Sequence, residues 1–135
     1  MSAKTTIVVR NYSDGTSLAA GEGGRLRSRD STARPQTWIL TEVDSFGDGV
    51  GICTFSSTAS PGTCLQAAGV GAAVTHEAGD GESSAQLWVV EPGGETTIGA
   101  VGSRGAVLQG NGPDAPVTLV RAKGTLNQRW ILHAE

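Results

Sequence analysis

The sequence predicts an all-β fold made of three copies of one four-stranded unit. The main observation is a repeated segment, Gln-x-Trp followed by two aliphatic residues, which contains all three tryptophans of the chain. Only five glutamines occur among the 135 residues, so chance does not account for three such pairs. Twenty glycines and five prolines separate short apolar runs, which is typical of strands joined by turns. No window carries the sustained apolar spacing of an amphipathic helix.

Each unit contains four candidate strands in the same order. The first precedes a turn that contains glycine, at residues 5–9, 50–55 and 96–101. The second includes that glycine and ends in leucine, at 15–18, 62–65 and 105–108. The third lies between this leucine and the glutamine, at 25–27, 73–76 and 117–120. The Gln-x-Trp segment is the fourth, at 36–40, 86–90 and 128–132, and strand alternation places Gln and Trp on one face.

The length and the repeat spacing predict a single domain over residues 1–135. A chain of this size can form its own core, and the units fall at approximately 1–45, 46–92 and 93–135. One unit cannot bury its apolar face alone, so the three should close around a shared core. Because aromatic residues are scarce, the repeated Gln and Trp should contribute much of it. The expected structural core residues are Gln36, Trp38, Gln86, Trp88, Gln128 and Trp130.

Composition narrows the choice of partners. The net charge of −3 is mild and argues against nucleic acid and other polyanions. No apolar stretch approaches membrane-spanning length, so no membrane insertion is expected. The N-terminal residues lack the apolar segment of a signal peptide. The sequence therefore indicates a cytoplasmic protein, or one released by a non-classical route.

Catalysis and cofactor binding are not expected. His76 lies on a predicted third strand and His133 lies close to the C-terminus, away from any nucleophile motif. The chain contains no Gly-x-Ser-x-Gly segment. Neither histidine stands at zinc-ligand spacing from the cysteines. We therefore expect no enzymatic activity, no metal and no organic cofactor.

Two features allow alternative interpretations. Cys53 and Cys64 lie on adjacent predicted strands of unit two, where they could form a disulfide bridge. The favoured alternative is two reduced, half-buried cysteines. Four arginines gather in unit one, and they form either a solvated strand face, which is favoured, or a specific anion site. These are Arg25, Arg27, Arg29 and Arg34.

The triple Gln-x-Trp repeat, with its four strands per unit, resembles the ricin-type (R-type) lectin family of β-trefoils. The resemblance covers the chain from Thr5 to the C-terminus. It implies a six-stranded barrel capped by three hairpins, with the tryptophans packed around a pseudo-threefold axis. It also implies a protein that binds carbohydrate.

The same resemblance implies particular sugar-binding residues. In the family, an Asp after the leucine of the second strand accepts hydrogen bonds from sugar hydroxyls. The matching positions here hold Ala19, Gln66 and Gln109, so units two and three keep a polar group and unit one does not. The residues expected to complete the two pockets are His76 and Glu77 in unit two, and Thr118 and Asn127 in unit three.

Two classes of function follow from the resemblance. The first is a lectin with one to three shallow sites for galactose or N-acetylgalactosamine-type glycans on glycoproteins or glycolipids. Several units, or a homodimer, would give such weak sites avidity. The alternative is a β-trefoil protease inhibitor, or another protein-binding module, that acts through surface loops.

Overall fold

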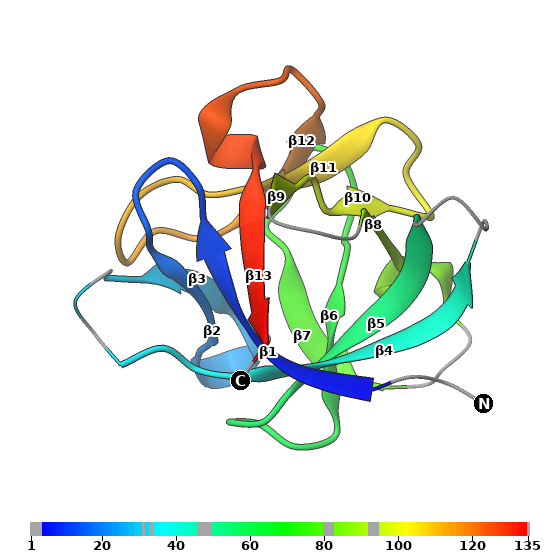
Figure 1. Ribbon diagram of the computed structural model, residues 1–135, viewed down its shortest axis with the longest axis horizontal. Coiled ribbons are helices and arrows are strands. Elements are labelled where there is room, and N and C mark those ends of the chain that lie inside the picture. Colours follow the sequence, from blue (N-terminus) through cyan, green and yellow to red (C-terminus); the bar gives the residue numbers. More distant parts are fainter. Residues whose placement is uncertain are drawn as a thin grey trace.

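The computed structural model describes residues 4–30, 32, 34–45, 50–79, 83–91 and 95–134. It confirms the predicted fold class, because the chain forms a β-trefoil of strands and short 3-10 turns (Figure 1). The tryptophan segments and the glycine-rich turns recur in each unit, which explains why the three units adopt the same order of elements.

Six strand positions form a closed antiparallel barrel. Unit one contributes β1 (Lys4–Asn11) and β4 (Trp38–Ser45), and unit two contributes β5 (Gly51–Ser57) and β8 (Trp88–Val90). Unit three contributes β13 (Trp130–Ala134) and a first strand in two pieces, β9 (Glu95–Thr96) and β10 (Gly99–Ala100). The pairing runs β1–β4–β5–β8–β10, and β9 pairs β13, which returns to β1. Among the described residues, each of the six strand positions is therefore paired on both sides.

Three hairpins extend from the barrel. They are β2 (Ser17–Ala20) with β3 (Leu26–Arg29), β6 (Thr63–Gln66) with β7 (Thr75–Ala78), and β11 (Ala106–Gln109) with β12 (Thr118–Arg121). Isolated bridges join each hairpin to the next, at Arg25 with Thr75, Ala73 with Thr118, and Arg27 with Pro116. The hairpins therefore form a ring, and each one lies against a loop of its neighbour.

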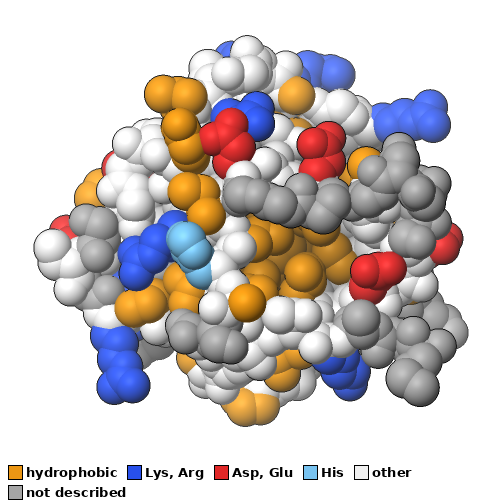
Figure 2. Space-filling view, viewed as in Figure 1, with side chains coloured by type: hydrophobic (Ala, Val, Ile, Leu, Met, Phe, Trp, Pro, Cys, Tyr) orange, Lys and Arg blue, Asp and Glu red, His pale blue; other side chains and the backbone are white. Residues whose placement is uncertain are grey.

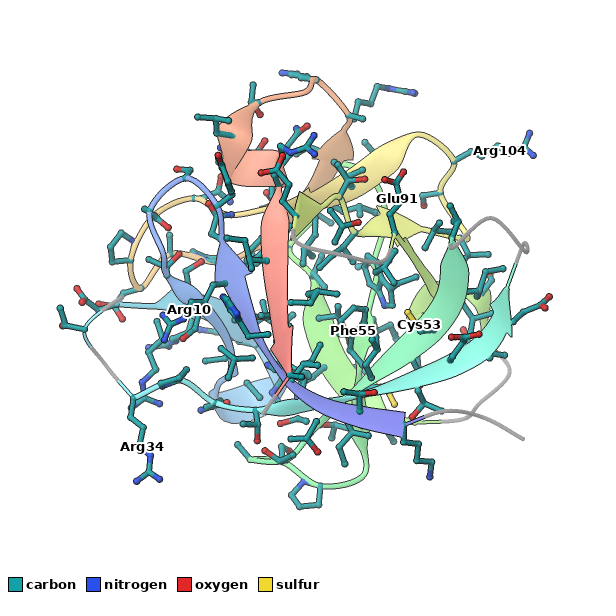
Figure 3. The ribbon with its side chains drawn as sticks, viewed as in Figure 1. Arg10, Arg34, Cys53, Phe55, Glu91 and Arg104 are labelled. Carbon is teal, nitrogen blue, oxygen red and sulfur yellow. The ribbon has the colours of Figure 1, made fainter. Side chains whose placement is uncertain are left out.

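The tryptophans of the repeat lie in the core, as expected. Trp38, Trp88 and Trp130 have no exposed surface. Each indole Nε1–H donates to the carbonyl oxygen of a second-strand leucine of its own unit at 3.0 Å, and these leucines are Leu18, Leu65 and Leu108. Figure 3 shows Phe55 and Cys53 inside the barrel, whereas Arg34 and Arg104 extend outward. Figure 2 shows hydrophobic side chains near the centre of one face and most basic side chains toward its periphery.

The glutamines of the repeat lie outside the strands, which corrects the sequence-based expectation. Each fourth strand begins at its Trp, and Gln86 and Gln128 end the 3-10 turns η2 (Ser84–Gln86) and η3 (Leu126–Gln128). Gln36 lies in the corresponding irregular segment and is half-buried. The turn breaks strand alternation, so these side chains point back toward their hairpins instead of sharing the face of the Trp.

Both cysteines are free and buried. Cys53 lies in the barrel core, where its thiol donates to the carbonyl oxygen of Trp88 at 3.6 Å. The Cys64 sulfur contacts the Ser56 hydroxyl at 3.4 Å. The two sulfurs thus have separate partners, and the reduced alternative applies.

We expect Trp88→Ala to lower the free energy of unfolding by about 3–5 kcal/mol, because it removes a fully buried indole and leaves a cavity. Urea denaturation followed by far-ultraviolet circular dichroism measures this change. The control Val70→Ala, at a side chain that is 50% exposed, should change stability by less than ~0.5 kcal/mol. A loss at Trp88 no larger than that of the control would contradict the role of the indole in the core.

We expect Cys53 to resist alkylation in the native protein. Burial, with a smaller effect from Glu42, raises the pKa of its thiol from 9.0 to about 12, so the reactive thiolate is scarce at neutral pH. The raised pKa contributes stability that is complete below pH 9.0 and is lost as the pH rises toward 12. Mass spectrometry after iodoacetamide treatment should show Cys53 modified in urea and unmodified in native buffer. Equal modification in both would refute this expectation.

Candidate functional site

The hairpin registers define three equivalent positions for the candidate sites. Leu18, Leu65 and Leu108 are equivalent because each accepts the hydrogen bond of its own tryptophan. The residues that follow them are Ala19, Gln66 and Gln109. Across the hairpins these pair with Arg27, Thr75 and Thr118, respectively. The threefold arrangement thus places one residue pair per unit at the same surface position.

Unit three brings Gln109 and Thr118 together through Asn111. The Gln109 amide Nε2 donates to Asn111 Oδ1 at 2.9 Å, and Asn111 Nδ2 donates to Thr118 Oγ1 at 3.0 Å. Asn111 Nδ2 also donates to the carbonyl oxygen of Pro116 at 2.9 Å. Sequence reasoning missed Asn111, although its place two residues after Gln109, at the start of the Asn-Gly-Pro-Asp turn, was a signal.

Asn127 lies at the edge of this group. Its Nδ2 donates to the carbonyl oxygen of Gly110 at 3.2 Å, and its Oδ1 accepts from the Thr125 hydroxyl at 2.6 Å. Its backbone oxygen accepts from Asn11 at 2.9 Å. The structure therefore places Asn127 beside the residue that follows Gln109, with both ends of its amide already held by the protein.

The repeat glutamines fix the orientation of Gln66 and Gln109. Gln86 Nε2 donates to Gln66 Oε1 at 2.9 Å, and Gln128 Nε2 donates to Gln109 Oε1 at 3.1 Å. Both repeat glutamines are buried, so their side chains have little freedom. The oxygen of Gln66 is thus held by the protein, and no hydrogen bond joins its Nε2 to another residue of the described ranges.

His76 does not lie on the face that carries Gln66. It pairs with Leu65 across the hairpin, is only 6% exposed, and its Nε2 donates to the carbonyl oxygen of Gly21 at 2.8 Å. Its Nδ1 lies 3.1 Å from Thr63 Oγ1. The ring therefore joins unit one to unit two, which corrects its assignment to the sugar site. The register instead gives Thr75 as the equivalent of Thr118.

Glu77 remains a candidate at the rim of unit two. It is exposed and pairs with Cys64, so it leaves β7 on the same face as Thr75. Amide, hydroxyl and carboxylate groups are thus gathered on one face of this hairpin. Such groups can donate to and accept from the hydroxyls of a sugar.

Unit one differs because Ala19 leaves its position open. A hollow of about 470 Å³ lies there, and its lining residues are Ala19, Ala20, Gly21, Arg27, Arg29, Gln36 and Asp114. Gln36 Oε1 accepts from the backbone N–H of Ala20 at 2.9 Å. This unit therefore has a cationic lining in place of the fixed amide of the other two.

Among the residues that the structure describes, no three His, Cys, Asp or Glu side chains are grouped so that they could hold a metal ion. No helix within the described ranges has the length and apolar character to span a membrane.

Comparisons with known proteins agree with the fold. No family model matches the sequence, and no curated protein matches it. The designed threefold-symmetric protein ThreeFoil superposes with a TM-score of 0.74 at 22% identity, over 95% of this chain and 97% of that one. The C-half of an earthworm R-type lectin in complex with GalNAc gives 0.67 at 18%, over 97% and 99%. SeviL bound to asialo-GM1 saccharide gives 0.67 at 21%, over 96% and 97%. These similarities show that the chain shares the β-trefoil fold of R-type lectins.

Proposed function

We propose that the protein is a non-enzymatic glycan-binding module whose hairpin sites in units two and three take galactose or N-acetylgalactosamine-type sugars. The observation that carries the proposal is the pair of equivalent amides at Gln66 and Gln109, each held by the buried glutamine of its own repeat. The structurally similar earthworm lectin and SeviL are themselves in complex with GalNAc and a saccharide. Their ligands support the class of ligand proposed here.

The fixed amides favour binding because they lose little conformational freedom when a sugar arrives. In unit two, Gln66 offers its Nε2 donor, and Thr75 and Glu77 lie on the same face. In unit three, Gln109, Asn111 and Thr118 form one chain of hydrogen bonds that a sugar hydroxyl can join. Asn127 supports the turn beside them.

Single sites of this kind should be weak. A shallow polar site that makes a few hydrogen bonds corresponds to a dissociation constant in the roughly millimolar to high-micromolar range. Two such sites on one domain, or more in a homodimer, would gain avidity on a glycoprotein or glycolipid surface that presents several sugars.

The second candidate function is a protein-binding module, such as a protease inhibitor, that acts through loops. It is favoured by two exposed apolar side chains in loop and turn segments, Val70 at 50% and Leu126 at 58%. A glycan array separates the two candidates, because an inhibitor of this kind would be silent on the array and active against a panel of serine and cysteine proteases.

We expect the double variant Gln66→Ala with Gln109→Ala to abolish binding of galactose-type ligands, because both fixed amides are removed. Isothermal titration calorimetry with galactose and N-acetylgalactosamine measures this, and a thermal melt confirms that the variant is folded. Ala19→Ser, at the equivalent position of unit one, is the matched control and should bind as the parent does.

Either of two results would count against this assignment. A folded double variant that binds like the parent would show that the sugar lies elsewhere. A parent protein that binds no glycan on the array would remove the lectin function and favour the loop-borne inhibitor.

A further inference from the structure

The hairpin of unit one carries a hollow where units two and three carry a glutamine. Ala19 is buried and ends in a methyl group, so the space beside it is not filled by an amide. The volume of about 470 Å³ lies within the range of ~300–1,000 Å³ that small-molecule sites occupy. The hollow therefore stands at the position of the two proposed sugar sites and has a different lining.

Two arginines provide the positive charge of this lining. Arg27 and Arg29 alternate along β3, so both side chains leave the strand on one face, and both border the hollow. Arg27 Nε lies over the backbone of Gly21, 3.4 Å from where a β-carbon would stand. Neither guanidinium forms a hydrogen bond or an ion pair with any residue in the described part of the chain. Two planar donors thus face one small volume, which suits a carboxylate.

Gln36 adds a neutral donor to the same hollow. Its Nε2 reaches the carbonyl oxygen of Ala20 only at 3.5 Å. In unit two, by contrast, the equivalent Gln86 Nε2 has two partners at 2.9 Å, and one of them is Gln66. Because Ala19 offers no such partner, Gln36 keeps its capacity to donate to a ligand.

Asp114 adds an acceptor from a different unit. It lies in the turn of unit three, where its backbone N–H donates to the carbonyl oxygen of Ser28 at 2.6 Å and its φ angle is 62°. This turn brings its exposed carboxylate to the hollow. A carboxylate accepts hydrogen bonds from hydroxyl groups and repels a second anionic group.

We propose that the hollow of unit one binds a saccharide that carries one carboxylate. The guanidinium groups of Arg27 and Arg29 contact the carboxylate, and Gln36 and Asp114 contact the hydroxyls. A neutral sugar would leave both guanidinium groups unused, and a polyanion would meet Asp114. The inference rests on the proposed function in that the ligand is a saccharide, and it gives unit one a ligand class different from that of units two and three.

The test uses isothermal titration calorimetry with two probes, sodium glucuronate and galactose. The parent should bind glucuronate, and binding should weaken between low ionic strength and about 0.5 M salt, because screening reduces the attraction of exposed guanidinium groups. Arg27→Gln with Arg29→Gln should weaken glucuronate binding about tenfold or more, since it removes the charge-assisted hydrogen bonds. Galactose binding should not change.

Two further variants distinguish specific binding in the hollow from nonspecific electrostatic attraction of glucuronate to the arginines. Arg25→Gln removes the same charge from the residue just before β3, but Arg25 does not line the hollow, so glucuronate binding should persist within about twofold. Ala19→Gln restores the pattern of the other two units. Its amide should fill the hollow and engage Gln36, so glucuronate binding should be lost while galactose binding is kept.

The outcomes distinguish this inference from the proposed function. If galactose binds and glucuronate does not, the site in unit one is refuted and the lectin function stands. If glucuronate binds through Arg27 and Arg29 and galactose does not bind, the unit-one site stands and the neutral sites fall. Sodium sulfate that displaces glucuronate at equal concentration would reduce the hollow to an anion site and overturn the saccharide assignment. Equal losses in Arg25→Gln and the double arginine variant would overturn it as well.

Discussion

The hydrogen bond from each buried indole to a second-strand leucine carbonyl is the contact on which the rest of the structure depends. It links the fourth strand of a unit, which belongs to the barrel, to the hairpin of the same unit. An unpaired buried donor would be costly, so the bond fixes the hairpin wherever the indole is buried. Trp38, Trp88 and Trp130 fill the shared core, and the three hairpins are thereby held in one ring.

The repeat glutamines link the buried core to residues at the surface. Gln86 and Gln128 are buried in the turns before their tryptophans, and each donates to the glutamine that follows a tryptophan-bound leucine. A residue that the fold requires therefore also orients a residue that a ligand can reach. Where that residue is alanine, as at Ala19, the same architecture produces a hollow. The difference between alanine and glutamine at one equivalent position thus changes the chemical groups of the site, while the backbone position of the site stays the same.

The sequence predicted the fold better than it predicted the candidate site residues, and the reason is physical. The repeat spacing and the burial of the tryptophans depend on residues that recur in every unit, so the pattern predicted three four-stranded units around a shared core. The barrel and its three hairpins were implied by the resemblance that the repeat carries. The face of a strand residue depends on register, and a displacement of one residue reverses it. His76 was therefore expected at the proposed sugar site, although it pairs with Leu65 and is buried, whereas Thr75 lies opposite Gln66. Asn111 was missed because turn geometry brings it back over Thr118.

The three units differ at the residue that pairs with the tryptophan-bound leucine across each hairpin. At the position opposite the tryptophan-bound leucine, unit three has Leu119, unit two has His76, and unit one has Ser28. Leu119 packs in the core, whereas His76 binds the neighbouring unit through Gly21. The Ser28 hydroxyl is buried without a hydrogen-bond partner among the described residues. Ser28 instead uses its backbone, which bonds to the turn that contains Asp114. The fold therefore accommodates different residues at this position. In unit one, the backbone bonds of Ser28 hold the turn that brings Asp114 of unit three to the hollow.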